Sequence, residues 1–316
     1  MADMIVSVSP HLHSKDTTRR IMLDVVIALL PALVMAVVRF GLHALALALV
    51  CVGSAVAAEA LSRKIMKREQ TVGDLSAVVT GLLLALNLPA TLPLWMGALG
   101  SVIAIVVVKQ CFGGLGQNFV NPAIAARIVL LLCFAGAMTS WQQPGFVLWN
   151  DGVTGASPLA ALKEGTTEGL PALTDFLFGL RAGSMGEVCA LALIAGGVYL
   201  LVRRVISPII PLCFIGTVFA GMLLRGGVTF ALYEVLSGGL LLGAIFMATD
   251  YVTSPITPWG KVIFGVGCGL ITLAIRLWGS LPEGVSYAIL LMNIFVPHIE
   301  KLTLPRPFGA RKGGKA

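Results

Sequence analysis

Charged residues are scarce in this chain: only 12% of its 316 residues are Asp, Glu, Lys or Arg, while 57% are hydrophobic. Soluble domains carry about a quarter charged residues, so the composition excludes an ordinary soluble globular protein. Aromatic residues are also few, at 7%, and the long apolar runs do not alternate with polar residues, which excludes a transmembrane β-barrel. The mean hydropathy of +0.94 instead indicates a polytopic α-helical membrane protein.

Paired cysteines are also lacking, since none of the six cysteines stands in a CxxC pair. All six lie in or beside apolar runs, where an unpaired cysteine is usually a small buried residue. The sequence therefore predicts no disulfide framework, no iron–sulfur cluster and no metal site in this chain. The net charge of +7 comes mostly from clusters that flank apolar runs, so it predicts membrane topology and no nucleic-acid partner.

The apolar runs predict about ten membrane spans, because a spanning helix needs about 20 such residues. The first half has candidate spans at Ile21–Phe40, Leu42–Leu61, Asp74–Leu88, Leu94–Cys111 and Asn121–Ser140. The second half has them at Gly186–Val202, Ser207–Leu224, Leu232–Thr249, Trp259–Leu277 and Gly284–Ile299. We therefore expect an all-α, multi-pass protein embedded in a lipid bilayer.

The distribution of basic residues predicts the orientation of these spans. With ten spans and a cytoplasmic N-terminus, about sixteen of the 22 Lys and Arg residues fall on the cytoplasmic side. Both termini are then cytoplasmic, and the polar segment Trp141–Met185 lies outside the membrane. Such a segment is long for a connection, which favours a functional role.

The two halves resemble each other in sequence. Thr80–Pro93 and Gly238–Pro255 are both Gly-Leu-Leu-Leu runs that are interrupted by polar residues and proline. Five spans in each half give the repeats opposite orientations, and inverted repeats with broken helices are typical of transporters. We predict three parts: a membrane repeat at 1–140, an extracytoplasmic loop at 141–185, and a second repeat with a cytoplasmic tail at 186–316.

Polar residues inside or at the ends of spans are candidates for an ion path. Asn87, Asn121 and Asp250 each stand next to a proline or at the end of an apolar run, where broken helices expose groups that coordinate cations. The simpler alternative is hydrogen bonding between helices. Asp24 and Glu59 lie within about a turn of basic clusters, so we expect them at the membrane interface.

The stretch "DGVTGASP", Asp151–Pro158, is unusually polar and flexible for this chain. Gly155 allows close approach to a bulky ligand, and Pro158 suits the first position of a helix after Ser157. Ser157 thus has a simple structural interpretation as a helix N-cap. The hydroxyls of Thr154 and Ser157 are also candidates for covalent attachment of a ligand.

Four stretches together resemble the membrane flavoprotein subunits of Rnf and Na⁺-translocating NADH:quinone oxidoreductase complexes, the NqrB/RnfD family. They are Asp151–Pro158, Gly114–Arg127, Phe246–Lys261 and Glu283–Lys301. The resemblance covers nearly the whole chain, and the length is closer to that of RnfD than to that of the longer NqrB.

The resemblance implies an FMN that is attached through its phosphate to the last hydroxyl of the motif, here Ser157. Asp151, Thr154, Gly155 and Ala156 then form the frame that a separate flavin transferase recognises. The chain departs from the family pattern at the acceptor, where Ser stands in place of the usual Thr. A serine hydroxyl forms the same ester, so the change concerns the efficiency of flavin attachment.

The resemblance also implies a function. The chain is expected to relay electrons in the bacterial cytoplasmic membrane, within a complex that couples ferredoxin and NAD⁺ chemistry to Na⁺ or H⁺ movement. Its partners would be other Rnf subunits, including a second covalent flavoprotein and iron–sulfur membrane subunits, and a noncovalent riboflavin is a further expected cofactor. Two alternatives stay open: an NqrB-like quinone-reducing subunit, and a stand-alone channel similar to urea transporters.

Overall fold

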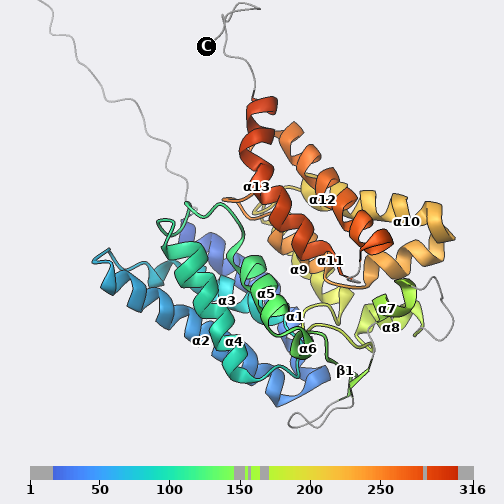
Figure 1. Ribbon diagram of the computed structural model, residues 1–316, viewed down its shortest axis with the longest axis horizontal. Helices are drawn as coiled ribbons and strands as arrows, with labels where there is room; N and C mark the ends of the chain where they lie inside the picture. Colours follow the sequence, from blue (N-terminus) through green and yellow to red (C-terminus); the bar gives the residue numbers. More distant parts are fainter. Residues whose placement is uncertain (1–16, 146–153, 156–157, 164–170, 280–282, 305–316) are drawn as a thin grey trace, which may run out of the picture.

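The computed structural model describes residues 17–145, 154–155, 158–163, 171–279 and 283–304 (Figure 1). The chain is almost entirely helical over these ranges, and the expected all-α class is confirmed. Asp151, Ala156 and Ser157 of the flavin motif lie outside the described residues.

The first half contains a row of apolar helices. They are α1 (Thr18–Phe40), α2 (Leu42–Ile65), η1 (Val72–Asp74), α3 (Ser76–Leu86), α4 (Leu94–Val102), η2 (Ile103–Gln110), α5 (Pro122–Cys133) and α6 (Ala135–Met138). α4 continues directly into η2, which is a π-helix: the N–H of Cys111 donates to the carbonyl of Val106 five residues earlier. π-Helical turns are rare and often lie at functional sites.

A short polar region separates the halves. It contains β1 (Trp141–Gln142), β2 (Thr154–Gly155), α7 (Pro158–Lys163) and α8 (Leu173–Phe178). The two strands pair in antiparallel fashion, with Trp141 opposite Gly155. In Figure 1, α7 and α8 lie beside the second half of the chain.

The second half begins at Ala190. Its elements are α9 (Ala190–Val202), α10 (Ile209–Leu236), α11 (Leu240–Leu242), η3 (Gly243–Met247), α12 (Pro258–Trp278) and α13 (Val285–Thr303). α11 and η3 form one continuous half-helix that ends in the interior. Its counterpart in the first half is α3, which ends at Leu86 before the segment "NLPATLP".

Among the described residues, five helices are long and apolar enough to cross a membrane: α1, α2, α10, α12 and α13. The same part of the chain holds four shorter apolar helices, namely α3, α4 with η2, α5 and α9. The break that the sequence predicts between the spans Ser207–Leu224 and Leu232–Thr249 is present in the structure. α10 consists of two helical stretches joined at Gly227, whose φ of +82° and ψ of −176° are not helical. The second predicted span combines the end of α10 with the half-helix.

Packing brings the two halves together along two helix pairs. α1 packs on α9, and α5 packs on α13. Within each half, α2 packs on α3 and α4, and α10 packs on α12. Figure 1 accordingly draws the first half (blue to green) on one side and α10–α13 (yellow to red) on the other. The division at residues 140 and 185 stays a prediction.

The helix bundle has two chemically different ends. The basic end, as we call it, carries Arg63 and Lys64 at the end of α2, Arg203 after α9 and Lys261 in the first turn of α12. The loop end carries β1, β2 and α7, where Lys163 of α7 donates to the carbonyl of Gly279 just after α12.

Candidate functional site

The two half-helices meet in the interior, at their C-terminal ends. The side-chain amide of Asn87, which caps α3, donates to the carbonyl of Leu83 at 2.8 Å and contacts Sδ of Met247 at 3.2 Å. Met247 is the last residue of η3. Helix C-termini carry partial negative charge and unsatisfied carbonyls, so this junction favours a cation.

Asn121 joins this junction from the start of α5. Its Oδ1 accepts hydrogen bonds from the backbone N–H groups of Ala123 at 3.0 Å and Ile124 at 3.3 Å, which caps the helix. Its Nδ2 donates to the carbonyl of Met247 at 3.2 Å. Pro122 takes the first helical position and fixes the turn. Both ends of the Asn121 amide are therefore held in place.

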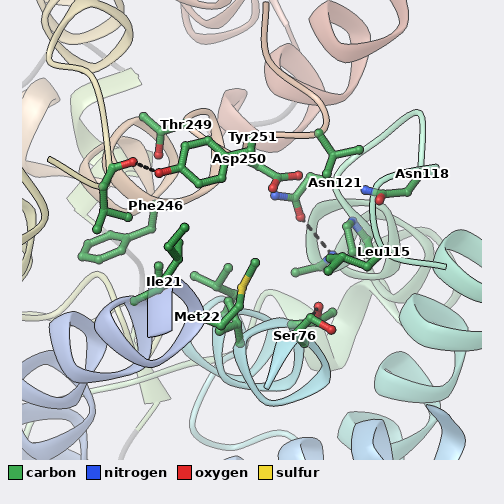
Figure 2. Close-up of a pocket in the computed structure, with 18 of the residues that line it drawn as sticks. Ile21, Met22, Ser76, Leu115, Asn118, Asn121, Phe246, Thr249, Asp250 and Tyr251 are labelled. Carbon is green, nitrogen blue, oxygen red and sulfur yellow. Dashed lines mark hydrogen bonds between the residues drawn. The ribbon is translucent and has the colours of Figure 1, made fainter. Parts of the chain in front are cut away.

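A cavity of about 100 Å³ opens beside this junction, towards the basic end. Asn121 and Asp250 belong to its lining, and Figure 2 shows them facing Met22 and Ser76 across the pocket. The walls are otherwise mostly apolar, with side chains from α1, α3 and η3. A cavity of this size has room for several water molecules, for which the side chains of Asn121 and Asp250 offer polar partners.

Asp250 lies in a turn beyond the end of η3, outside the helical spans. The hydroxyl of Thr253 donates to its carboxylate at 3.1 Å. Burial raises the pKa of the Asp250 carboxyl above its usual range, and the hydrogen bond from Thr253 only partly opposes this.

An ion pair that the sequence did not predict borders the same pocket. Glu59 is fully buried and its Oε1 accepts from Nζ of Lys109, Nε2 of Gln110 and the hydroxyl of Thr71, all at 2.9–3.0 Å. Nζ of Lys109, a pocket residue, also donates to Oγ of Ser76 at 2.6 Å. Glu59 is therefore buried against protein partners, and its expected depth at the membrane interface stays a prediction.

Asp24 is likewise buried against protein partners, and its expected depth at the membrane interface stays a prediction. It is 7% exposed, and it accepts from the hydroxyl of Tyr199 at 2.9 Å and from Arg203 at 3.1 Å. Tyr199 lies in α9 and Arg203 directly follows it, so Asp24 links α1 to α9. The sequence placed an acid near a basic cluster but gave no signal of its partner.

The described residues on either side of Ser157 are fixed at the loop end. Gly155 pairs with β1, and a methyl group added to it would lie 2.9 Å from Nε2 of Gln143, so the absence of a side chain permits a close approach. Pro158 is buried and begins α7, as its position in the sequence predicts. This helix start agrees with both interpretations of Ser157, the N-cap and the flavin acceptor.

α7 is anchored to the second half of the chain. Leu159 is buried and lies against Gly238, where an added methyl group would come within 2.5 Å of its Cδ1. Nζ of Lys163 donates to the carbonyl of Gly279 at 2.6 Å, and Arg225 donates to the carbonyl of Lys163 at 3.3 Å. The predicted site residues that the structure describes thus fall into two groups: Asn87, Asn121 and Asp250 at the junction and pocket, and Thr154 and Gly155 at the loop end.

Comparison with known proteins agrees with this architecture. The sequence matches the NQR2, RnfD, RnfE family over residues 5–309. It is 51% identical over 312 residues to a subunit of the Na⁺-translocating ferredoxin:NAD⁺ oxidoreductase complex of Acetobacterium woodii, with 98% of this chain and 96% of the relative covered.

Two further relatives carry names of the same kind. A subunit of the proton-translocating ferredoxin:NAD⁺ oxidoreductase complex of Clostridium ljungdahlii is 42% identical over 320 residues, with 97% of this chain and 96% of the relative covered. A subunit of the ion-translocating oxidoreductase complex of Escherichia coli K12 is 38% identical over 348 residues, with 98% and 99% covered. The chain therefore belongs to the NQR2, RnfD, RnfE family.

Proposed function

We propose that the chain is the RnfD component of an Rnf-type complex, carrying an FMN esterified to Ser157 and taking part in electron transfer that is coupled to ion movement. Three relatives that match nearly the full length are named as subunits of ion-translocating oxidoreductase complexes. Partners would be the other Rnf subunits, including a second covalent flavoprotein and iron–sulfur membrane subunits. A flavin transferase would be needed for maturation.

One observation carries the flavin assignment: the described chain is anchored on both sides of the acceptor, at Gly155 and at Pro158. Only two residues separate these anchors, so a group attached to Ser157 is held close to β2 and α7. In the proposed transfer, the hydroxyl oxygen of Ser157 bonds to the flavin phosphorus while the phosphorus–oxygen bond to the leaving group of an activated flavin nucleotide donor breaks. The hydroxyl proton passes to solvent. The bound flavin supplies the electron-transfer chemistry, and the chain positions it.

The proposed orientation follows from the two ends of the bundle. The basic end faces the cytoplasm and the loop end faces the outer side of the bacterial inner membrane, in line with the positive-inside rule. The flavin motif is then extracytoplasmic and the pocket of Asn121 and Asp250 opens towards the cytoplasm.

Ion movement is proposed to pass the junction of the half-helices, with Asn87, Asn121 and Asp250 along the path. Two helix C-termini and a carboxylate favour a small cation there. The relatives from Acetobacterium woodii and Clostridium ljungdahlii are named for sodium and for protons, respectively, so both ions belong to the proposal. The expected noncovalent riboflavin stays a prediction without an assigned place.

The direct test is the mass of the tryptic peptide that ends at Lys163, taken from the protein produced together with its complex and a flavin transferase. We expect the mass of the peptide plus esterified FMN, and a fluorescent band in denaturing gels. Ser157→Ala should abolish both signals. Thr139→Ala, which removes another hydroxyl of the same tryptic peptide outside the motif, is the matched control and should keep them.

An unmodified peptide in the wild-type complex would refute the flavin assignment. The half-helices and pocket would then favour the channel alternative, which flux of a small neutral solute into proteoliposomes would test. If the flavin is present, the NqrB-like alternative is decided by the electron acceptor: quinone reduction in place of ferredoxin and NAD⁺ exchange would support it.

A further inference from the structure

Six charged side chains fill the loop end of the bundle, beneath α7. They comprise three arginines and three glutamates: Arg127, Arg181, Arg276, Glu187, Glu234 and Glu283. All are buried except Glu283, whose side chain is 14% exposed. The three positive and three negative formal charges are equal in number, and each glutamate lies within ion-pair distance of an arginine. Charged groups in a protein interior need such partners.

Glu283 holds three helices at once. Its Oε2 accepts from the guanidinium of Arg127 on α5, and its Oε1 accepts from the backbone N–H of Gly239 at 3.0 Å. Gly239 is the N-cap of the half-helix α11–η3, and Glu283 itself directly precedes α13. Arg127 also donates to the hydroxyl of Ser286 in the first turn of α13. The pair therefore joins α5 of the first half to two elements of the second.

The carboxylate of Glu187 accepts from the backbone N–H of Gly238, the residue before Gly239. Oε1 of Glu187 accepts from the N–H of Gly238 at 2.9 Å, while its Oε2 accepts from Ser184. The carbonyl of Glu187 accepts from Arg181 at 2.6 Å. The loop of Glu187 is bonded in turn to the first half, because the N–H of Gly186 donates to the carbonyl of Leu86 at the end of α3.

The half-helix α11–η3 connects this charged cluster to the pocket. Its first residues are bonded by Glu187 and Glu283 at the loop end, and its last residue, Met247, contacts Asn87 and Asn121 at the junction. At about 1.5 Å per residue, the half-helix spans about 12 Å between these two sets of bonds.

Glu283 remains ionised in this arrangement. Burial alone would raise its pKa, but the charge and hydrogen bond of Arg127, with the amide of Gly239, hold the pKa below the usual range for a glutamate. The bond to Arg127 is consequently a charge-assisted one, which is about twice as strong as a neutral hydrogen bond.

We propose that Glu283 is a latch that closes the loop end of the ion path, by bonding Arg127 of α5 and the N-terminus of α11 at the same time. The inference rests on the ion path of the proposed function. The pocket leads from the basic end to Met247, and the latched cluster occupies the opposite end. Releasing the latch frees the half-helix from α5 and admits water to the cluster from the outer side.

The test measures water access at Ser237, whose side chain is fully buried in the cluster next to Gly238. Ser237→Cys introduces a thiol of nearly the same size. The whole complex in intact cells is treated with a membrane-impermeant thiol reagent, and modification at residue 237 is read by mass spectrometry. We expect Glu283→Gln to speed modification about tenfold, because a bond to a charged group shifts an equilibrium by about this factor.

Glu300→Gln is the matched control, since Glu300 is an acid on the same α13 but at the basic end, where it bonds the N–H of Ile256. It should leave the modification rate unchanged. If Glu283→Gln fails to accumulate, Arg127→Lys replaces it: Lys keeps the charge but cannot hold Glu283 and Ser286 together, and we expect an increase of about threefold.

An unchanged rate in a folded Glu283→Gln or Arg127→Lys variant would overturn the latch. The flavin peptide is measured in the same samples. A missing flavin refutes the proposed function without affecting the labelling rates, whereas unchanged labelling with the flavin in place refutes only the latch.

Discussion

With the Asn293 amide turned to the orientation that satisfies its neighbours, its side-chain oxygen accepts a hydrogen bond from the backbone N–H of Asn121 at 3.1 Å, which ties the middle of α13 to the start of α5. The amide of Asn293 also donates to the carbonyl of Thr253 at 3.0 Å. Arg127, in the middle of α5, in turn donates a hydrogen bond to the hydroxyl of Ser286 in the first turn of α13. α5 and α13 therefore each bond the start of the other helix.

Replacing Asn293 by Ala should loosen the pocket. The change leaves the N–H of Asn121 and the carbonyl of Thr253 without partners in a buried setting. We expect a loss of about 0.6 to 1.7 kcal/mol in the free energy of unfolding, the range found for hydrogen bonds between membrane helices. Thermal unfolding of the purified protein in detergent measures this.

Ser54→Ala is the control for Asn293, because the hydroxyl of Ser54 bonds only carbonyls of its own helix α2. Its unfolding temperature should stay close to that of the wild type. Equal unfolding temperatures for Asn293→Ala and Ser54→Ala would contradict the role of Asn293 in joining α13 to α5.

Gly196 marks the closest contact between α1 and α9. A methyl group added to it would lie 2.2 Å from the carbonyl oxygen of Ala28, which is backbone and has no room to yield. We expect Gly196→Ala to destabilise the protein by about 1 to 3 kcal/mol through overpacking. Gly53→Ala on α2 has nothing within 4 Å of the new methyl group, so it should be neutral or stabilising by up to about 1 kcal/mol. The test compares the unfolding temperatures of Gly196→Ala and Gly53→Ala, and equal temperatures would contradict a tight contact at Gly196.

The helical architecture was predictable because it depends on local composition. Apolar runs indicated the spans, and prolines near Asn87 and after Asp250 indicated the broken helices. The break in α10 was predictable for the same reason. Arg225, Gly226 and Gly227 interrupt the hydropathy, and the structure places a non-helical residue there, Gly227, with a positive φ that few other residues reach.

Pairings between distant residues could not be predicted from the sequence. The sequence singled out Asn87, Asn121 and Asp250 from their own neighbourhoods, and the structure gathers them around one junction and pocket. Glu59 and Lys109 are 50 residues apart, and Arg127 and Glu283 are 156 apart. Only the packing of α2 on η2, and of α5 on α13, brings these charges into contact.

The Glu59–Lys109 pair offers a test of buried charge at the pocket. Lys109→Met leaves the carboxylate of Glu59 without its cation, and we expect a loss of about 3 to 5 kcal/mol in stability. The double variant Glu59→Gln, Lys109→Met removes both charges and should regain most of that loss. A double-mutant cycle on unfolding temperatures measures the coupling, and additive losses would contradict a direct ion pair.

Cation binding at Asp250 should depend on pH in a defined direction. The carboxyl must be ionised to bind a cation, and its pKa is raised, so protons compete up to a higher pH than at an ordinary aspartate. Na⁺ affinity should therefore rise with pH and level off only above the raised pKa, as measured by binding of radioactive sodium between about pH 5 and pH 9.

Asp250→Asn should bind Na⁺ more weakly at every pH and lose this dependence, because an amide does not titrate in that range. Asp175→Asn on α8, an acid at the loop end, is the control and should keep the wild-type profile. A wild-type profile in Asp250→Asn would remove Asp250 from the ion path.

Leu159 should govern how rigidly the proposed flavin is held. Its burial against Gly238 fixes α7, and replacing a buried leucine by alanine costs about 2 to 5 kcal/mol, enough to release a six-residue helix. We expect the esterified flavin of Leu159→Ala to show lower fluorescence anisotropy, with an unchanged peptide mass. Leu180→Ala, an exposed leucine at the same end, should match the wild type. Wild-type anisotropy in Leu159→Ala would mean that α7 does not position the flavin, since the ester bond alone would then account for its immobility.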